Sequence, residues 1–137
     1  MSPRESYSGR MKCQLQGSRA VIDASDAARA FGQAQRLCED VCARFCIVVE
    51  ELVANLYEHG GLTGEDQVEL DLGREPDGIR ITIADPGKPF DPRSATPKRG
   101  RPDRGGGAGI DIVRSWAQFV DYTVTMEGNR LELMLPI

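Results

Sequence analysis

Apolar residues recur along this chain at two spacings, one typical of helices and the other typical of strands. Within residues 39–58 they stand three or four positions apart, as the buried face of a helix requires: Val41, Phe45, Val48, Val49, Leu52, Val53 and Leu56. Gly60 and Gly61 follow directly and indicate the end of this helix. The pattern therefore predicts one long amphipathic helix in the first half of the chain.

Two further helices are predicted, one before and one well after the long helix. The earlier helix would be capped by Asp23 or Ser25 and would continue to Leu37. The later helix would begin at about Ala108 and would keep its apolar face as far as Phe119.

Strict alternation of apolar and polar residues predicts several short strands. Residues 76–78 form a Pro-Asp-Gly hairpin signal between two of them, and residues 128–129 form a Gly-Asn turn between two others. The expected strands are residues 11–15, 68–72, 79–83, 120–124 and 131–135.

Strands grouped into hairpins, with helices between the groups, predict an α+β protein: a two-layer α/β sandwich with its helices on one face of the sheet. At 137 residues the chain is expected to form a single domain, residues 1–137, with the polar residues 1–10 disordered. Residues 85–107 are rich in prolines, glycines and charges, and a connection of this length is typical of a functional loop.

Composition and charge argue against several classes of protein. The net charge of -4 does not favour a surface for direct nucleic-acid binding. No apolar run approaches the roughly 20 residues of a membrane span, and no apolar secretory signal opens the chain. We therefore expect a cytoplasmic protein with no membrane partner. Cys38, Cys42 and Cys46 stand four apart, unlike the ligands of a zinc knuckle, and we interpret them as packed thiols.

Glu51 and Asn55 are candidate catalytic and metal-binding residues on the long helix. Because they stand four positions apart, they share a helix face with their Cβ atoms about 5–6 Å apart. Mg²⁺ prefers oxygen ligands and usually keeps several waters, so the Asn55 amide oxygen and nucleotide phosphates would suffice to hold it. Glu51 could accept a proton from an attacking hydroxyl. A solvated helix face is the alternative for this pair taken alone.

Asp85 directly follows a predicted strand, and Gly87 stands two positions later. A carboxylate at the end of a strand can accept a hydrogen bond from the exocyclic amine of adenine. Glycine would let the backbone approach the base closely. The alternative is an ordinary turn, since Asp, Pro and Gly are common turn residues.

A glycine-rich segment precedes the third predicted helix. Backbone N–H groups at a helix N-terminus can bind phosphate oxygens, and glycines remove the side chains that would block them. The segment lacks the Gly-Lys-Ser/Thr of the Walker type. The candidate nucleotide-binding residues here are Arg104, Gly105, Gly106, Gly107, Ala108 and Gly109.

A cluster of basic residues lies between the Asp-x-Gly motif and this glycine segment. In an acidic protein such local positive charge suits a lid over a triphosphate, which we place at residues 92–106. A solvated loop is the equal alternative. The cluster consists of Arg93, Lys98, Arg99, Arg101 and Arg104.

Each of these motifs is weak alone, but their order along the chain is specific. It resembles the order in the Bergerat-fold ATPases, which include gyrase and the histidine kinases, and above all the anti-sigma-factor serine kinases. That family's N-box corresponds to residues 51–55, its Asp-x-Gly motif to residues 85–87 and its second glycine motif to residues 107–109. The resemblance implies a mixed, mostly antiparallel sheet.

The resemblance also implies roles for individual residues. Glu51 would be the general base, Asn55 the Mg²⁺ ligand and Asp85 the partner of adenine, while Gly107 and Gly109 would contact the phosphates of ATP. One departure is Pro89, which stands where a further glycine is common in the superfamily.

By this resemblance the chain is expected to be an ATP-dependent protein-serine/threonine kinase and an anti-sigma factor. It would phosphorylate a small antagonist (anti-anti-sigma) domain, bind a sigma factor and take part in transcription regulation, with homodimer formation left open. Two alternatives belong to other classes: a non-catalytic, ATP-gated binding module, and a detached histidine-kinase ATP-binding domain.

Overall fold

The computed structural model describes residues 4–7, 9–89, 91 and 106–137. Its strands are β1 (Arg4–Tyr7), β2 (Arg10–Gln16), β3 (Gln67–Glu75), β4 (Gly78–Asp85), β5 (Gln118–Thr125) and β6 (Gly128–Pro136). A short 3-10 helix (Gly17–Arg19) precedes the α-helices α1 (Ala20–Ala34), α2 (Glu39–His59) and α3 (Gly106–Trp116).

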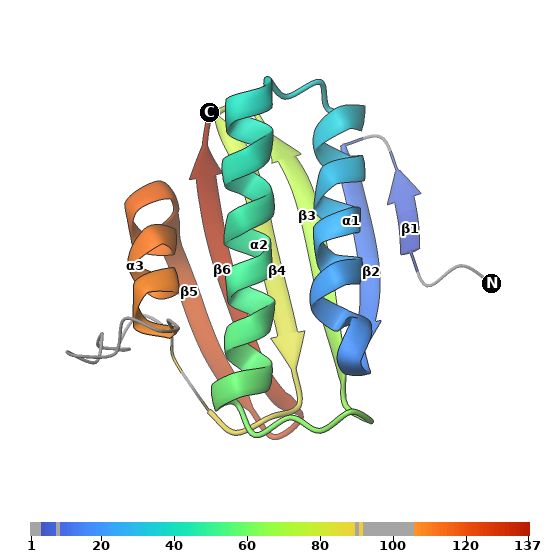
Figure 1. The fold of residues 1–137 in the computed structure, drawn as a ribbon, viewed down its shortest axis with the longest axis vertical. Coiled ribbons are helices and arrows are strands. Elements are labelled where there is room, and N and C mark those ends of the chain that lie inside the picture. The colour runs from blue at the N-terminus through green and yellow to red at the C-terminus, as the bar shows by residue number, and fades with distance from the viewer. Residues whose placement is uncertain (1–3, 8, 90, 92–105) are drawn as a thin grey trace.

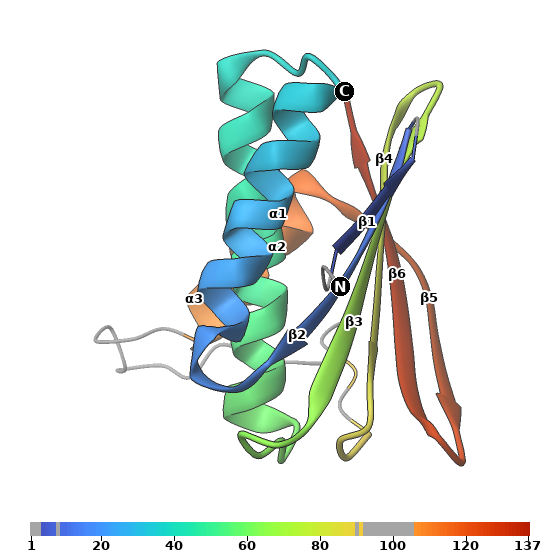
Figure 2. The same cartoon turned by 90° about the vertical axis from the view of Figure 1, so that its right-hand side faces the viewer.

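The strands form one sheet in the order β1-β2-β3-β4-β6-β5. The three α-helices lie on one face of this sheet, as Figure 2 shows from the side. The predicted α+β two-layer sandwich is therefore confirmed. The expected mixed sheet is corrected, because each pairing between described strands is antiparallel.

The core lies between the sheet and helices α1 and α2. Alternate residues of the central strands point toward the helices, and Leu72, Ile81 and Leu133 are fully buried there. Phe31 of α1 and Phe45 of α2 join the two helices, with their ring centroids 6.0 Å apart. This packing fixes α2 over the middle of the sheet (Figure 1).

The opposite face of the sheet is polar and carries ion pairs between neighbouring strands. Arg10 of β2 lies 2.7 Å from Asp71 of β3, and Arg80 of β4 pairs with Glu132 of β6. The alternation of apolar and polar residues thus assigns one face of the sheet to the core and the other to charged side chains.

Helix α2 matches its prediction closely, whereas α1 begins and ends earlier than predicted. Because α1 begins at Ala20, Asp23 and Ser25 lie inside the helix and do not cap it. The helix ends with Arg36 in the left-handed conformation (φ 57°), and the Leu37 N–H donates to Gly32 O at 3.0 Å. This is the Schellman pattern, in which glycine is the usual residue, so an arginine there gave no sequence signal.

The two ends of the chain also differ from expectation. Residues 4–7 pair with β2, with Arg4 opposite Cys13, so this part of the expected disordered segment 1–10 is a strand. At the other end, α3 ends at Trp116, and Phe119 belongs to β5. A register irregularity between Phe119 and Asp121 interrupts the simple alternation that the sequence suggested for this strand.

Within the described residues, no helix has the length and apolar character needed to cross a membrane.

Candidate functional site

Three of the predicted motifs meet at one end of the sandwich. The C-terminal end of α2, the end of β4, the turn between β5 and β6 and the first residues of α3 all lie there (Figure 1). Helix α2 connects them, since Glu51 lies against Gly109 of α3 and Gly60, at the end of α2, lies against Gly87. Antiparallel packing and short turns thus bring together residues more than fifty positions apart.

Glu51 lies in the contact between α2 and α3. Its carboxylate occupies the space beside the Gly109 Cα, where any side chain would overlap Oε2. Burial raises the pKa of Glu51 above the ordinary 4.5, and the negative charges of Glu58 and Glu50 raise it further. Within the described residues the Glu51 side chain forms no hydrogen bond or ion pair, so its carboxylate oxygens are available to a proton or a ligand.

Asn55 lies one turn after Glu51, on the same helix face, and only 6% of its surface is exposed. Its amide takes part in no hydrogen bond within the described part of the chain. Because its amide is not among the fully buried side-chain atoms that lack a partner, the amide reaches the surface, where water or a ligand can bind it. Both residues lie in α2, four positions apart, so their predicted proximity on one helix face is confirmed. Their roles remain predictions.

A magnesium ion fits this site only if a nucleotide supplies most of its ligands. Among the described residues, no group of three or more His, Cys, Asp or Glu side chains could hold a metal ion. Mg²⁺ commonly binds through one or two protein oxygens together with phosphate oxygens and water. The free amide oxygen of Asn55 is compatible with that arrangement.

Asp85 is the last residue of β4 and is 7% exposed. Its Oδ1 accepts hydrogen bonds from the Gly87 N–H at 2.8 Å and from Asn129 Nδ2 at 3.2 Å. Burial raises the pKa of Asp85 above its ordinary value of 3.8, while these two hydrogen bonds oppose the rise. Both act on one oxygen, so Oδ2 stays available to a ligand.

Gly87 is required by its close packing against its surroundings. A Cβ there would collide with Gly60 O and would lie 2.9 Å from Leu62 Cδ2 and 3.0 Å from Asp85 Oδ1. Next to it, the Lys88 N–H donates to Gly60 O at 2.8 Å. The Asp-x-Gly segment is therefore packed against the end of α2. The hydrogen bond from the Gly87 N–H to Asp85 Oδ1 is also that of an ordinary Asp turn, so the alternative interpretation stays open and the adenine role of Asp85 remains a prediction.

Asn129 is the residue of this site that the sequence did not reveal. The Gly-Asn pair was expected to form a turn, but the turn lies at residues 126–127, and Asn129 belongs to β6 opposite Asp85. Its Nδ2 donates to Asp85 Oδ1, Gly87 O at 3.0 Å and Lys88 O at 3.1 Å. Asn129 is identified as a site residue only by its position opposite Asp85 in the sheet, and that strand pairing is known only from the structure.

The glycine segment is described only in part. Gly106, Gly107 and Ala108 belong to the first turn of α3, and Gly109 follows in the same helix. A helix therefore opens within the predicted phosphate-binding segment, as expected. Arg104, Gly105 and the predicted lid, apart from Gly106, lie outside the described residues.

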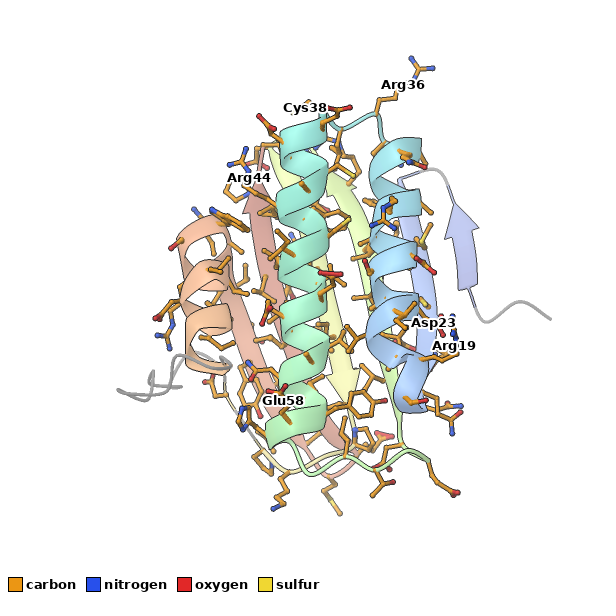
Figure 3. All side chains as sticks on the ribbon, viewed as in Figure 1. Arg19, Asp23, Arg36, Cys38, Arg44 and Glu58 are labelled. Atoms are coloured by element: carbon orange, nitrogen blue, oxygen red, sulfur yellow. The ribbon has the colours of Figure 1, made fainter. Side chains whose placement is uncertain are left out.

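The cysteine stripe lies along α2 and has no part in the site. Figure 3 places Cys38 and Glu58 at opposite ends of the helix, and the stripe begins at the end remote from Asp85. Cys46 is buried, and burial together with the neighbouring Cys42 thiol raises its pKa to about 11. Such a thiol is unreactive at neutral pH, so the packed-thiol interpretation is confirmed for Cys46. Cys42 is only partly buried, and Cys38, at the N-cap of α2, is exposed, so the interpretation is wrong for Cys38.

A family model and a solved structure are similar to this chain. A family model described as "Histidine kinase-like ATPase domain" matches residues 17–135. No curated protein matches the chain significantly. Among solved structures, a match is the histidine kinase domain of the blue-light activated histidine kinase of Erythrobacter litoralis EL346, with 20% sequence identity and a TM-score of 0.49.

That alignment covers 70% of this chain and 44% of the other, so the chain spans less than half of the kinase structure that it matches. The family model, in contrast, spans nearly the whole chain and includes Glu51, Asn55, Asp85 and Gly109. The chain belongs to the histidine kinase-like ATPase domain family.

Proposed function

We propose that this protein is an ATP-dependent protein-serine kinase that also acts as an anti-sigma factor. The observation that carries the proposal is the state of Glu51. Its carboxylate is partly buried at the candidate nucleotide site and has no polar partner among the described residues. A carboxylate that has no polar partner and a raised pKa is suited to accept a proton.

The proposed roles follow the positions of the side chains. Asp85 would recognise adenine through Oδ2, because Oδ1 is already occupied by the Gly87 N–H and Asn129. Asn55 would hold Mg²⁺ together with phosphate oxygens and water. The N-terminal turn of α3, from Gly106, would present backbone N–H groups to the phosphates.

In the proposed reaction, a serine or threonine hydroxyl of the antagonist domain transfers its proton to Glu51. The hydroxyl oxygen bonds to the γ-phosphorus as the bond from that phosphorus to the β,γ-bridging oxygen breaks, and ADP leaves. Bound Mg²⁺ would supply charge neutralisation at the phosphates. The protein contributes position and a proton acceptor, which are the main requirements of phosphoryl transfer.

The proposed partners rest on family resemblance and on charge. The protein has a net charge of -4, and a phosphate group adds about -1.5 to -2 charges to its acceptor. The phosphorylated antagonist should therefore bind more weakly than the unmodified one. A sigma factor has basic surfaces for nucleic acid, which suit an acidic partner.

A direct test combines the protein, Mg-ATP labelled on the γ-phosphate and candidate antagonist domains, followed by mass spectrometry of the phosphosite. Phosphoserine or phosphothreonine is the expected result, formed much more slowly with Glu51→Gln. Phosphohistidine on a partner would instead identify a detached histidine-kinase ATP domain. ATP binding without transfer to any acceptor would identify a non-catalytic, ATP-gated binding module.

A further inference from the structure

We propose that Asn129 is a positioning residue for base recognition, orienting the Asp85 carboxylate and thereby setting the preference for a 6-amino purine. This inference rests on the proposed nucleotide binding. It assigns selectivity to a residue in β6, outside the three sequence motifs, through its contacts with the Asp85 side chain and with the turn that follows.

The contacts of Asn129 join two parts of the chain more than forty positions apart. One amide nitrogen lies 3.2 Å from Asp85 Oδ1, 3.0 Å from Gly87 O and 3.1 Å from Lys88 O. Three acceptors around this nitrogen fix the orientation of the amide, because the flipped amide would place its oxygen against three other oxygens. The donor role of Asn129 is therefore determined by its neighbours.

The backbone of the β5–β6 hairpin brings Asn129 to this position. The preceding residue, Gly128, has φ 140°, and a Cβ there would collide with Asp85 O and lie 3.0 Å from Pro86 Cα. Only glycine permits that approach, which sets Asn129 directly across from Asp85 in the pairing of β4 with β6.

The other end of the Asn129 amide is left unsatisfied. Asn129 is 5% exposed, and its Oδ1 is a buried oxygen with no hydrogen-bond partner in the described structure. A buried acceptor without a partner is destabilising. The amide nitrogen offsets this cost, because it donates to the Asp85 carboxylate and to two backbone carbonyls of the following turn, and an apolar side chain of similar size would leave all three without this donor.

As a result, the two carboxylate oxygens of Asp85 have different surroundings. Oδ1 accepts from both the Gly87 N–H and Asn129, whereas Oδ2 receives no hydrogen bond within the described residues. Rotation of the carboxylate would break both bonds to Oδ1. Oδ2 therefore keeps one direction, and an acceptor fixed in direction favours an exocyclic amine over a carbonyl or a hydrogen at the same place on the base.

A purely structural role would have a different signature, which separates the two interpretations. If Asn129 only fastened β6 to the turn, its removal would weaken all nucleotides to the same degree. If it orients Asp85, its removal should weaken adenine nucleotides selectively. The ratio of two affinities is therefore the informative quantity, and it is insensitive to any general loss of stability.

The experiment measures the Kd of ADP and of the diphosphate of purine riboside, which has hydrogen in place of the 6-amine, by calorimetry. The wild type should prefer ADP by about tenfold or more, as expected for a hydrogen bond to a charged acceptor. In Asn129→Leu this preference should fall toward unity, mainly through loss of ADP affinity. Arg130→Gln, at the exposed neighbouring position, is the control and should keep the wild-type ratio.

An unchanged ratio in a folded Asn129→Leu protein would overturn the proposal. If that variant does not fold, the isosteric pair Asn129→Thr and Asn129→Val decides, because only threonine retains a donor. Stronger ADP preference in the threonine variant supports the role of Asn129, and equal preference in both refutes it. Failure of the wild type to bind ADP would instead refute the proposed function, which is a separate result.

Discussion

The carboxylate of Glu51 in α2 lies directly against the Cα of Gly109 in α3. A Cβ added to Gly109 would overlap Glu51 Oε2 and would lie 2.7 Å from its carboxyl carbon. The sequence assigned Gly109 to phosphate binding, which remains a prediction. The structure gives this glycine a second reason for lacking a side chain, because it provides the space that the proposed general base occupies.

Gly109→Ala should therefore impair chemistry more than binding. The added methyl group must displace the Glu51 carboxylate, and misplacement of a catalytic group by about 1 Å can cost about 10²-fold in rate. We expect slower single-turnover phosphoryl transfer with a smaller change in the Kd of ADP. Gly64→Ala is the matched control, since a Cβ at Gly64 meets nothing within 4 Å. An equal loss in affinity and rate would indicate that Gly109 serves the phosphates alone.

Glu51→Gln should separate binding from phosphoryl transfer. Glutamine keeps the size of the side chain but cannot accept the proton, so transfer should fall by roughly 10²–10⁴-fold while ADP affinity changes little. The exposed Glu65→Gln removes a charge without perturbing Glu51 and should leave the rate close to that of the wild type. Wild-type transfer by Glu51→Gln would exclude Glu51 as the base.

The same substitution should stabilise the ligand-free protein at neutral pH. Burial raises the pKa of Glu51 in the folded state, so the folded protein binds this proton more tightly than the unfolded chain does. The resulting stabilisation is present below the ordinary pKa of 4.5 and is lost as the pH rises through the folded-state pKa.

Because glutamine does not ionise, Glu51→Gln should melt at a higher temperature than the wild type at about pH 7. The difference should diminish as the pH falls below 4.5, where Glu51 is protonated in both states. Thermal melts at several pH values check this, with the exposed Glu65→Gln as the control. A gain that does not depend on pH would contradict the assigned cause.

Asp85→Ala should abolish the preference for adenine. Loss of a hydrogen bond to a charged acceptor costs about 1.5–3 kcal/mol, so ATP should bind about ten- to a hundredfold more weakly or worse. We expect the wild type to bind GTP weakly, and that binding should change less. Asp77→Ala, in the hairpin between β3 and β4, is the control. Equal affinity of the wild type for ATP and GTP would refute the role of Asp85 in base recognition.

Gly128→Ala should destabilise the fold and weaken ADP binding together. The Cβ would collide with Asp85 O, and φ of 140° is a conformation that residues other than glycine rarely adopt. Strain and overpacking of this kind typically cost about 1–3 kcal/mol. Urea unfolding and ADP titration check both effects, and Gly73→Ala in β3, whose Cβ would lie 4.0 Å from Arg80 Cβ, is the control. Wild-type stability of Gly128→Ala would show that the hairpin can move away from Asp85.

Local patterns determined most of the secondary structure of this protein. Apolar residues recur every 3.6 positions in α2 and every second position in β3, β4 and β6, because those side chains face the core. Such a period can be recognised in the sequence. The motifs at Glu51, Asn55 and Asp85 were found for the same reason, since each depends on spacing within one element or at its end.

The ends of helices and strands were harder to predict from the sequence where a residue occupies a position at which another residue type is usual. Arg36 adopts the left-handed conformation at the end of α1, and Phe119 lies in a strand, β5, where helical spacing predicted more helix. In both places tertiary packing outweighs the local conformational preference of the residue. That preference contributes about 1 kcal/mol, and packing against the core readily exceeds it.

The contacts that complete the candidate site were decided by the tertiary structure alone. Gly109 meets Glu51 because α3 packs beside α2, and Asn129 meets Asp85 because β6 pairs with β4 in that register. The two residues of each pair are far apart in the sequence and belong to different elements, so no rule based on residue spacing could predict their contact. The sequence by itself determined which residues carry the proposed chemistry, and long-range packing determined which residues hold them in position.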